Sequence, residues 1–349
     1  MRTDNKPEMQ HFVPKAALLK NFAVKGKGKT SYHVHLFDRL KGRVIPSQPS
    51  VNNVLGQRNF YSVRLGETVY TAEHGLTALE DATSPIIKKI VSSGSLASVS
   101  NGERQKLSTF VAAQWLRAPK IRDSQSTLWK TVAEKCERLA PDAPNLEQIK
   151  AYASDDAIKC SSIRLLSDAT TELAGMVYSY RWLLFRSTKN QSFWISDCPV
   201  VMHSHEDFGP YGTLGFGVPG IQITMPLSSE YALSIWHPKL VRDKQIELEE
   251  GSKVVQNFRA SRTLNPNSRL QVLGNRLGEL EAALGGIRAL LDSLDRGDAI
   301  QASEDNMEHY NSLQFDWSLR FIVSKQNDFH LAEKMFASEP ARGVKFRLD

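Results

Sequence analysis

Three short apolar runs between residues 192 and 238 constrain the fold most strongly, because each is too short for a typical helix. They read SFWISDCPVV, GIQITMPL and EYALSIWHP, and turns rich in Gly and Pro separate them. Short β-like runs divided by turn residues are typical of a small antiparallel sheet. Most of the remaining chain has hydrophobic residues at helical spacing. The sequence therefore predicts a helix-rich α+β fold with a small antiparallel sheet.

Helical spacing extends along much of the chain on both sides of these runs. Asn101 is predicted to cap one of the helices, and residues 155–187 are expected to form one long helix or a broken pair. Residues 31–37 alternate between the two faces of an extended chain, which predicts a strand. The predicted helices cover residues 14–22, 72–91, 101–120, 122–139, 155–187, 306–325 and 329–337.

The composition predicts a folded protein with one substantial core. The chain has 349 residues, of which 41% are hydrophobic and 23% charged. Because the predicted strands are distant in the sequence, we expect one integrated domain over residues 1–349. Within it, residues 237–303 are predicted to form a helical insertion, either a surface hairpin or a partner-binding element centred on 275–296.

Charge, cysteine content and hydropathy narrow the expected setting. The formal net charge of +6 moderately favours a polyanionic partner, such as a nucleic acid. Three widely spaced cysteines, Cys136, Cys160 and Cys198, indicate reduced thiols and a cytoplasmic protein. The N-terminus has no apolar core typical of a signal peptide, and no apolar run is long enough for a membrane span.

Gly28-Lys29-Thr30 matches the end of a phosphate-binding loop, but its surroundings do not. Ala23 occupies the position of the first glycine, helical spacing precedes the turn, and strand-like alternation follows it. A phosphate-binding loop needs the reverse order, since the phosphate lies at the N-terminus of the following helix. We therefore expect no nucleotide cofactor at this turn.

Polar side chains interrupt the apolar faces of several predicted helices. Glu80 falls within the arc formed by Leu76, Leu79, Ile86, Ile87 and Ile90. Gln114 lies in the middle of the apolar face of the next helix, with Arg117 one turn further on. Asn311, Gln314 and Ser318 form a polar stripe along an otherwise apolar helix. A buried polar or charged group is costly unless it is paired, so these residues predict either a site or internal pairing.

His11 and Asp197 are predicted at the ends of elements. His11 precedes the helix expected to start at Pro14, and Asp197 leaves a strand before a proline turn. Each candidate also has a structural interpretation. Glu80 and Arg117 would form a buried ion pair that fixes helix packing, Gln114, Asn311 and Gln314 would satisfy buried backbone groups, and Asp197 would cap its own turn.

Several segments together resemble a bacterial family, the domain-of-unknown-function family 4238. They include QHFVPKAALLKNFA, LTALEDATSPIIKKI, QWLRAP, FWISDCPVV and HYNSLQFDWSLRFIVSK, and they cover residues 10–236 and 304–337. The resemblance implies that the family's polar positions fall on His11, Glu80, Arg117, Asp197, Asn311 and Gln314. Where relatives tend to have Asn after this aspartate, the chain has Cys198. The resemblance implies a shared fold and site but no reaction.

Two functions are compatible with these residues. In the first, the protein is a hydrolase that acts on a phosphodiester or nucleotide substrate. A metal-dependent nuclease in bacterial defence is one example of such an enzyme. His11, Glu80, Arg117 and Asp197 would be catalytic, His11, Glu80 and Asp197 would hold Mg²⁺ or Mn²⁺, and Gln114, Asn311 and Gln314 would bind substrate. In the second, the protein binds a ligand or partner without catalysis, and the polar residues are structural.

Overall fold

Two sheets, antiparallel except for one strand pair, form the centre of the protein, and shorter strand pairs accompany them. The computed structural model describes residues 9–26, 28, 31–204, 206, 214–264 and 271–338. The larger sheet has the order β11-β12-β13-β9-β14 and the smaller one the order β10-β15-β4-β5. All neighbouring strands are antiparallel except β14, which pairs with β9 in parallel. The strands are β11 (Val201–Ser204), β12 (Ile221–Pro226), β13 (Tyr231–Trp236), β9 (Arg181–Arg186), β14 (Ala299–Gln301), β10 (Ile195–Ser196), β15 (Phe321–Ser324), β4 (His35–Asp38) and β5 (Arg43–Ile45).

The central strands of the larger sheet are buried on both faces. Every residue of β12 and β13 is buried, although the two strands include Gln222, Thr224 and Ser234. These three polar side chains lie within one hydrogen-bonded group, in which the Gln222 amide donates to the Ser234 hydroxyl over 2.9 Å and to the Tyr310 hydroxyl over 3.1 Å. The pairing allows polar residues to occupy the middle of the core.

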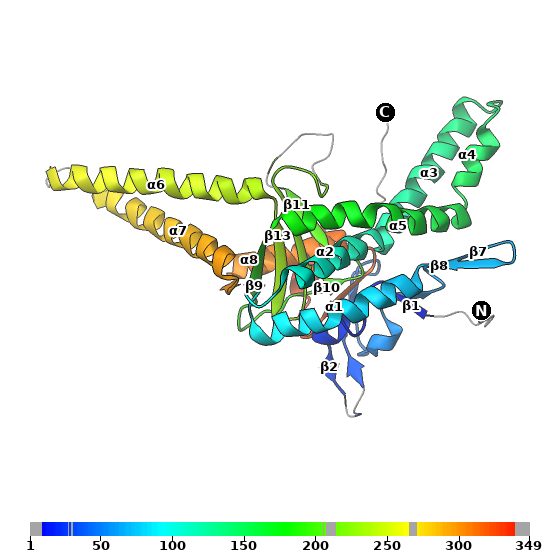
Figure 1. Cartoon of the computed structure of the whole chain (residues 1–349), viewed down its shortest axis with the longest axis horizontal. Coiled ribbons are helices and arrows are strands. Elements are labelled where there is room, and N and C mark those ends of the chain that lie inside the picture. The colour runs from blue at the N-terminus through cyan, green and yellow to red at the C-terminus, as the bar shows by residue number, and fades with distance from the viewer. Residues whose placement is uncertain are drawn as a thin grey trace.

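Helices cover the larger sheet and connect it to the smaller one. Helix α2 packs against α1 and α5, and Figure 1 shows these helices crossing in front of the sheet. Helix α8 contacts both β10 and β11, so it bridges the two sheets. The helices of the body are α1 (Glu73–Ser93), α2 (Asn101–Leu116), α3 (Pro119–Leu139), α4 (Leu146–Tyr152), α5 (Asp155–Ser179), α8 (Glu304–Trp317) and α9 (His330–Ser338).

Residues 237–303 contain two long helices that project from the body as a hairpin (Figure 1). Helix α6 covers Pro238–Leu264, and α7 covers Gln271–Arg296. Leu284 of α7 packs on Gly251 of α6, where an added Cβ would lie 2.5 Å from a leucine methyl. A small residue therefore lets the two helices approach closely. The binding of a protein partner through residues 275–296 stays a prediction.

Short hairpins and 3₁₀ turns complete the N-terminal part of the fold. Strand β1 (Met9–His11) pairs with β6 (Gly56–Arg58), and β7 (Ser62–Leu65) pairs with β8 (Thr68–Thr71). The Lys-Gly turn lies between β2 (Val24–Lys25) and β3 (Tyr32–His33), which pair as a hairpin. Lys29 and Thr30 lie outside the described residues. The remaining short elements are η1 (Leu19–Phe22) and η2 (Val51–Asn53).

The structure confirms the helix-rich α+β class and corrects several boundaries. Residues 155–187 form α5 and then strand β9, and residues 306–325 end in strand β15. Both strands lie deep in the core, and a short apolar run there cannot be distinguished from a buried helix by periodicity. Residues 192–201 divide between β10 in one sheet and β11 in the other.

Two predicted helix starts also differ from the structure. The N-cap of α2 is Ser100, whose hydroxyl accepts the Glu103 amide while the Glu103 carboxylate accepts the Ser100 amide. This capping box leaves Asn101 inside the helix. Residues 14–22 form turns that end in the 3₁₀ helix η1 instead of a regular α-helix.

Candidate functional site

Glu80, Gln114 and Arg117 meet in a network that we call the arginine cluster. Arg117 is the C-cap residue of α2 and is only 4% exposed. Its Nη1 lies 2.6 Å from Glu80 Oε1 in α1, and its Nε lies 2.9 Å from Gln114 Oε1. The Gln114 amide donates in turn to the Phe12 carbonyl over 2.6 Å. The cluster therefore ties two helices to the N-terminal segment.

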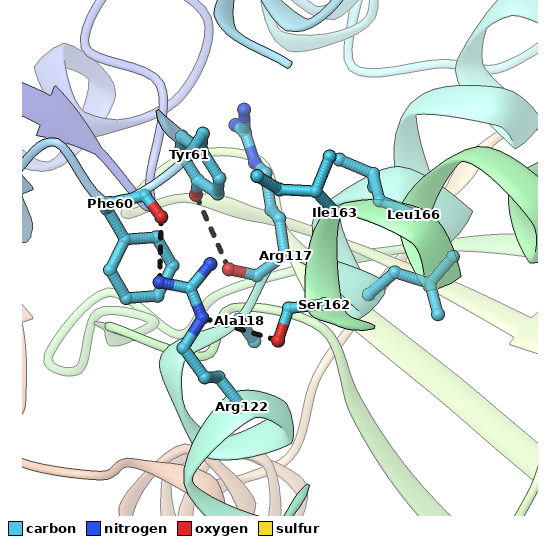
Figure 2. Close-up of a pocket in the computed structure, with 9 residues that line it drawn as sticks. Phe60, Tyr61, Arg117, Ala118, Arg122, Ser162, Ile163 and Leu166 are labelled. Carbon is cyan, nitrogen blue, oxygen red and sulfur yellow. Dashed lines mark hydrogen bonds between the residues drawn. The ribbon is translucent and has the colours of Figure 1, made fainter. Parts of the chain in front are cut away.

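The space beside Arg117 is almost filled by protein. Figure 2 shows the Tyr61 hydroxyl directed at the Arg117 carbonyl, and Arg122 directed at the Phe60 carbonyl and the Ser162 hydroxyl. The Arg122 guanidinium also lies 3.5 Å from the centroid of the Phe60 ring, and burial lowers the pKa of Arg122 to about 10. The cavity that remains has a volume of about 10 Å³, which is space for one water molecule. It has no room for a substrate.

His11 lies in β1 near the arginine cluster without hydrogen bonding to it. Its Nε2 is 3.2 Å from the Asn52 carbonyl oxygen. Burial is the largest cause that lowers the pKa of His11 below 6.5, and the charges of Lys15 and Arg117 lower it further. A neutral imidazole near two cations is compatible with a role as a proton acceptor and with a purely structural role in packing.

The lowered pKa of His11 predicts a pH dependence of stability. Because the folded protein disfavours the imidazolium, His11 stabilises the fold fully above the unfolded pKa of 6.5, and this contribution is lost as pH falls through the lower folded pKa. We expect proton NMR to show a His11 titration midpoint below 6.5. The free energy of unfolding should fall less on acidification in His11→Gln than in the wild-type protein. A midpoint at or above 6.5 would contradict the prediction.

Asp197, Asn311 and Gln314 each bind backbone groups where the segment around β10 meets α8 and the turn after it, and we call these three residues the aspartate cluster. Asp197 follows β10 and is 2% exposed. Its Oδ1 accepts the Leu319 amide over 2.8 Å, and its Oδ2 accepts the amides of Arg320 and Phe321 over 2.8 and 3.0 Å. Burial raises the pKa of Asp197 and the three amides oppose that shift. Both carboxylate oxygens are thus occupied by the turn between α8 and β15.

The two amide side chains of the aspartate cluster bind backbone on the segment around β10. Asn311 accepts the Trp194 amide over 2.9 Å and donates to the Ser192 carbonyl over 3.0 Å. Gln314 accepts the Ser196 amide over 2.9 Å and donates to the Pro199 carbonyl over 3.0 Å. These contacts hold α8 against a strand that has few pairing partners of its own.

The structure does not gather the predicted metal ligands. In the regions that the structure describes, no group of three or more His, Cys, Asp or Glu side chains is placed to hold a metal ion. His11, Glu80 and Asp197 are all described, and they do not form such a group. The physical reason lies in their partners, because Asp197 is held by backbone amides, Glu80 by Arg117 and His11 by a carbonyl.

An open hollow with a largely polar lining was not predicted from the sequence. It has a volume of about 540 Å³ and lies where the ends of β9 and β15 approach each other. Arg186, Lys189 and Lys325 line it together with one carboxylate, Glu230, and several amide and hydroxyl side chains. The misassignment of both strands as helix hid this site, because Arg186 ends β9 and Lys325 follows β15, and the two strands lie in different sheets. The signal was present in Arg186, which directly follows an apolar run, and in Lys189 three residues later.

The fold and its clusters define a helix-rich α+β domain with two buried polar networks and one open, basic hollow. The chain belongs to the family described as "Protein of unknown function (DUF4238)", whose model matches residues 9–328. No curated protein and no solved structure matches the chain. Among the described helices, none is both long and apolar enough to cross a lipid bilayer.

Proposed function

We propose that this protein binds a small anionic ligand in the open hollow and that its two buried polar clusters are structural. The observation that carries the proposal is the set of cations around the hollow. Arg186, Lys189 and Lys325 all line it, and across the described residues none of them forms an ion pair with an acidic side chain. Cations converging without carboxylate partners favour an anion that pairs with them on binding.

The hollow has the size and the rigid walls that a ligand site needs. Its volume of about 540 Å³ lies within the range of about 300–1,000 Å³ typical of small-molecule sites. The Arg186 carbonyl accepts the Ala302 amide over 2.8 Å, and the Gln301 side chain donates to the Ser187 carbonyl over 2.7 Å. The backbone at Arg186 and Ser187 is therefore held in place before a ligand arrives.

The arginine and aspartate clusters are better explained as structural. Their carboxylate and amide groups bond to Arg117, to backbone or to the Ser196 hydroxyl, and the cavity beside Arg117 has space for only one water molecule. A catalytic group needs access to the reacting atoms, whereas a packing group needs a partner within the core. The contacts of Gln114, Asn311 and Gln314 fit the second description.

The test is calorimetric titration of the protein with pyrophosphate at low ionic strength. We expect binding that weakens about tenfold in Arg186→Gln and in Lys325→Gln, because each loses one charged hydrogen bond. Lys88→Gln is the matched control, since Lys88 is exposed on α1 and does not line the hollow. Absence of pyrophosphate binding, or equal binding by all variants, would overturn the proposal.

Hydrolysis of a phosphodiester or nucleotide is the second candidate. One observation favours it, because Glu80 is 28% exposed and reaches solvent beside Arg117, whose charge acts on the neighbouring His11. The net charge of +6 agrees with a nucleic-acid or nucleotide substrate. A nuclease role in bacterial defence and a cytoplasmic location stay predictions.

Purified protein incubated with DNA, RNA and nucleotides in the presence of Mg²⁺ or Mn²⁺ tests the second candidate. If the protein is a hydrolase, the wild type should turn over one of these substrates. His11→Asn and Glu80→Gln should abolish that turnover at a temperature where circular dichroism shows both variants folded. Turnover that is equal in the variants would remove these residues from the mechanism, and absence of turnover would leave ligand binding as the function.

A further inference from the structure

A second, smaller hollow adjoins the basic one and has the opposite charge. It has a volume of about 130 Å³ and is lined by two carboxylates, Glu308 of α8 and Asp328 before α9, and by His330. Gln191, Ser192 and Gln326 line both hollows, so one wall separates the two spaces. A ligand in the larger hollow therefore contacts residues that also line the smaller hollow.

The larger hollow is lined mainly by cationic side chains and the smaller one by carboxylates. Among the described residues that line them, the larger hollow has three cations against one carboxylate, whereas the smaller one has two carboxylates and no lysine or arginine. Glu308 forms no ion pair with any side chain that the structure describes. From the part of the chain that the structure describes, Asp328 Oδ1 accepts the His330 backbone amide alone, over 3.4 Å. Both carboxylates therefore keep acceptor capacity for an ammonium group.

The shared wall contains a hydrogen-bond acceptor without a partner. Gln191 Oε1 is buried and accepts no hydrogen bond from any residue that the structure describes, although the Gln191 backbone amide donates to the Thr188 hydroxyl over 3.1 Å. Buried polar atoms without partners are rare, and they often mark a site for a missing donor. A rotation of this side chain toward either hollow would bring the oxygen to an N–H of a bound ligand.

Resting on the proposed anion site, we infer that the two hollows together bind a dipolar ligand, a phosphate monoester that carries a primary amine. The phosphate pairs with Arg186, Lys189 and Lys325 in the larger hollow. The ammonium lies against Glu308 and Asp328 in the smaller hollow, and Gln191 accepts a hydrogen bond between them. The doubly charged phosphate is preferred to a carboxylate because three cations surround the anionic end.

The experiment compares amines with alkyl chains of the same length. Calorimetric titrations use 2-aminoethyl phosphate against propyl phosphate and 4-aminobutyl phosphate against pentyl phosphate, so that in each pair a methyl replaces the ammonium. We expect at least one amine to bind about tenfold tighter than its alkyl partner, because an ammonium gains charged hydrogen bonds that a methyl lacks.

Three variants test whether the higher affinity of the amine depends on the smaller hollow and the shared wall. Glu308→Gln and Asp328→Asn should reduce the difference within a pair while leaving the affinity for the alkyl phosphate unchanged, and Gln191→Leu should reduce it as well. Glu304→Gln is the control, since it removes a carboxylate from the first turn of the same helix outside both hollows.

The outcomes separate this inference from the proposed function. If the alkyl phosphates and pyrophosphate fail to bind, both proposals fall. If the alkyl phosphates bind in a manner that depends on Arg186 and Lys325 while neither amine adds affinity, the anion site stands and the dipolar ligand is rejected. An amine preference that persists in Glu308→Gln, Asp328→Asn and Gln191→Leu would also reject it, because the ammonium would then lie elsewhere.

Discussion

Asp197→Ala is expected to lower the free energy of unfolding by about 4 kcal/mol, since three buried backbone amides lose their acceptor at about 1–3 kcal/mol each. The amides belong to Leu319, Arg320 and Phe321, which lead directly into strand β15. A domain is typically stable by about 5–15 kcal/mol, so the variant should retain only part of its stability or accumulate in an unfolded state.

The conservative variant keeps this prediction measurable if the alanine variant does not fold. Asp197→Asn retains one acceptor oxygen and should lose about half as much, or about 2 kcal/mol. Urea unfolding followed by circular dichroism measures both values, and Asp142→Ala at an exposed position should change stability by less than about 0.5 kcal/mol. A wild-type unfolding curve for Asp197→Asn would show that the aspartate does not hold the turn.

Glu80→Gln is expected to destabilise the protein by about 2–3 kcal/mol, less than the full cost of breaking a buried pair because solvent screens the exposed carboxylate. The substitution leaves the guanidinium of Arg117, whose side chain is 2% exposed, without its counter-charge. Gln114 still accepts from Arg117, but a neutral acceptor compensates a buried charge poorly. The melting temperature should fall by several degrees.

A double-mutant cycle determines whether Glu80 and Arg117 act as a pair. Arg117→Met removes the charge and keeps much of the apolar volume, so Glu80→Gln combined with Arg117→Met should be more stable than the sum of the two single losses implies. The coupling is expected at about 1–2 kcal/mol. Additive losses would indicate that the ion pair does not contribute to packing.

These variants also separate the two candidate functions. If the clusters are structural, Glu80→Gln and Asp197→Asn change stability and leave pyrophosphate affinity unchanged below their unfolding temperatures. Arg186→Gln and Lys325→Gln should show the reverse pattern, because both side chains are exposed and line the hollow. The same proteins therefore report on the core and on the ligand site independently.

The sequence by itself determined the class of fold and most of the long helices. The apolar stripes of α1 and α2 were evident because a surface helix alternates between core and solvent every 3.6 residues. The same stripes identified Glu80, Gln114 and Arg117 as polar residues directed inward, and the structure places Gln114 and Arg117 in the core with Glu80 at its margin. Periodicity detects such residues because each interrupts a regular apolar face.

Only the tertiary structure decided what these residues contact and where a ligand has room. The partners of Asp197 lie more than a hundred residues away in the chain, and no local pattern specifies such a pairing. Strands β9 and β15 looked like helix because their environment is apolar on both faces, which removes the alternation that identifies a strand. The hollow is lined by residues at the ends of these two strands, which belong to different sheets, and hydrophobic spacing does not encode how the two sheets are placed.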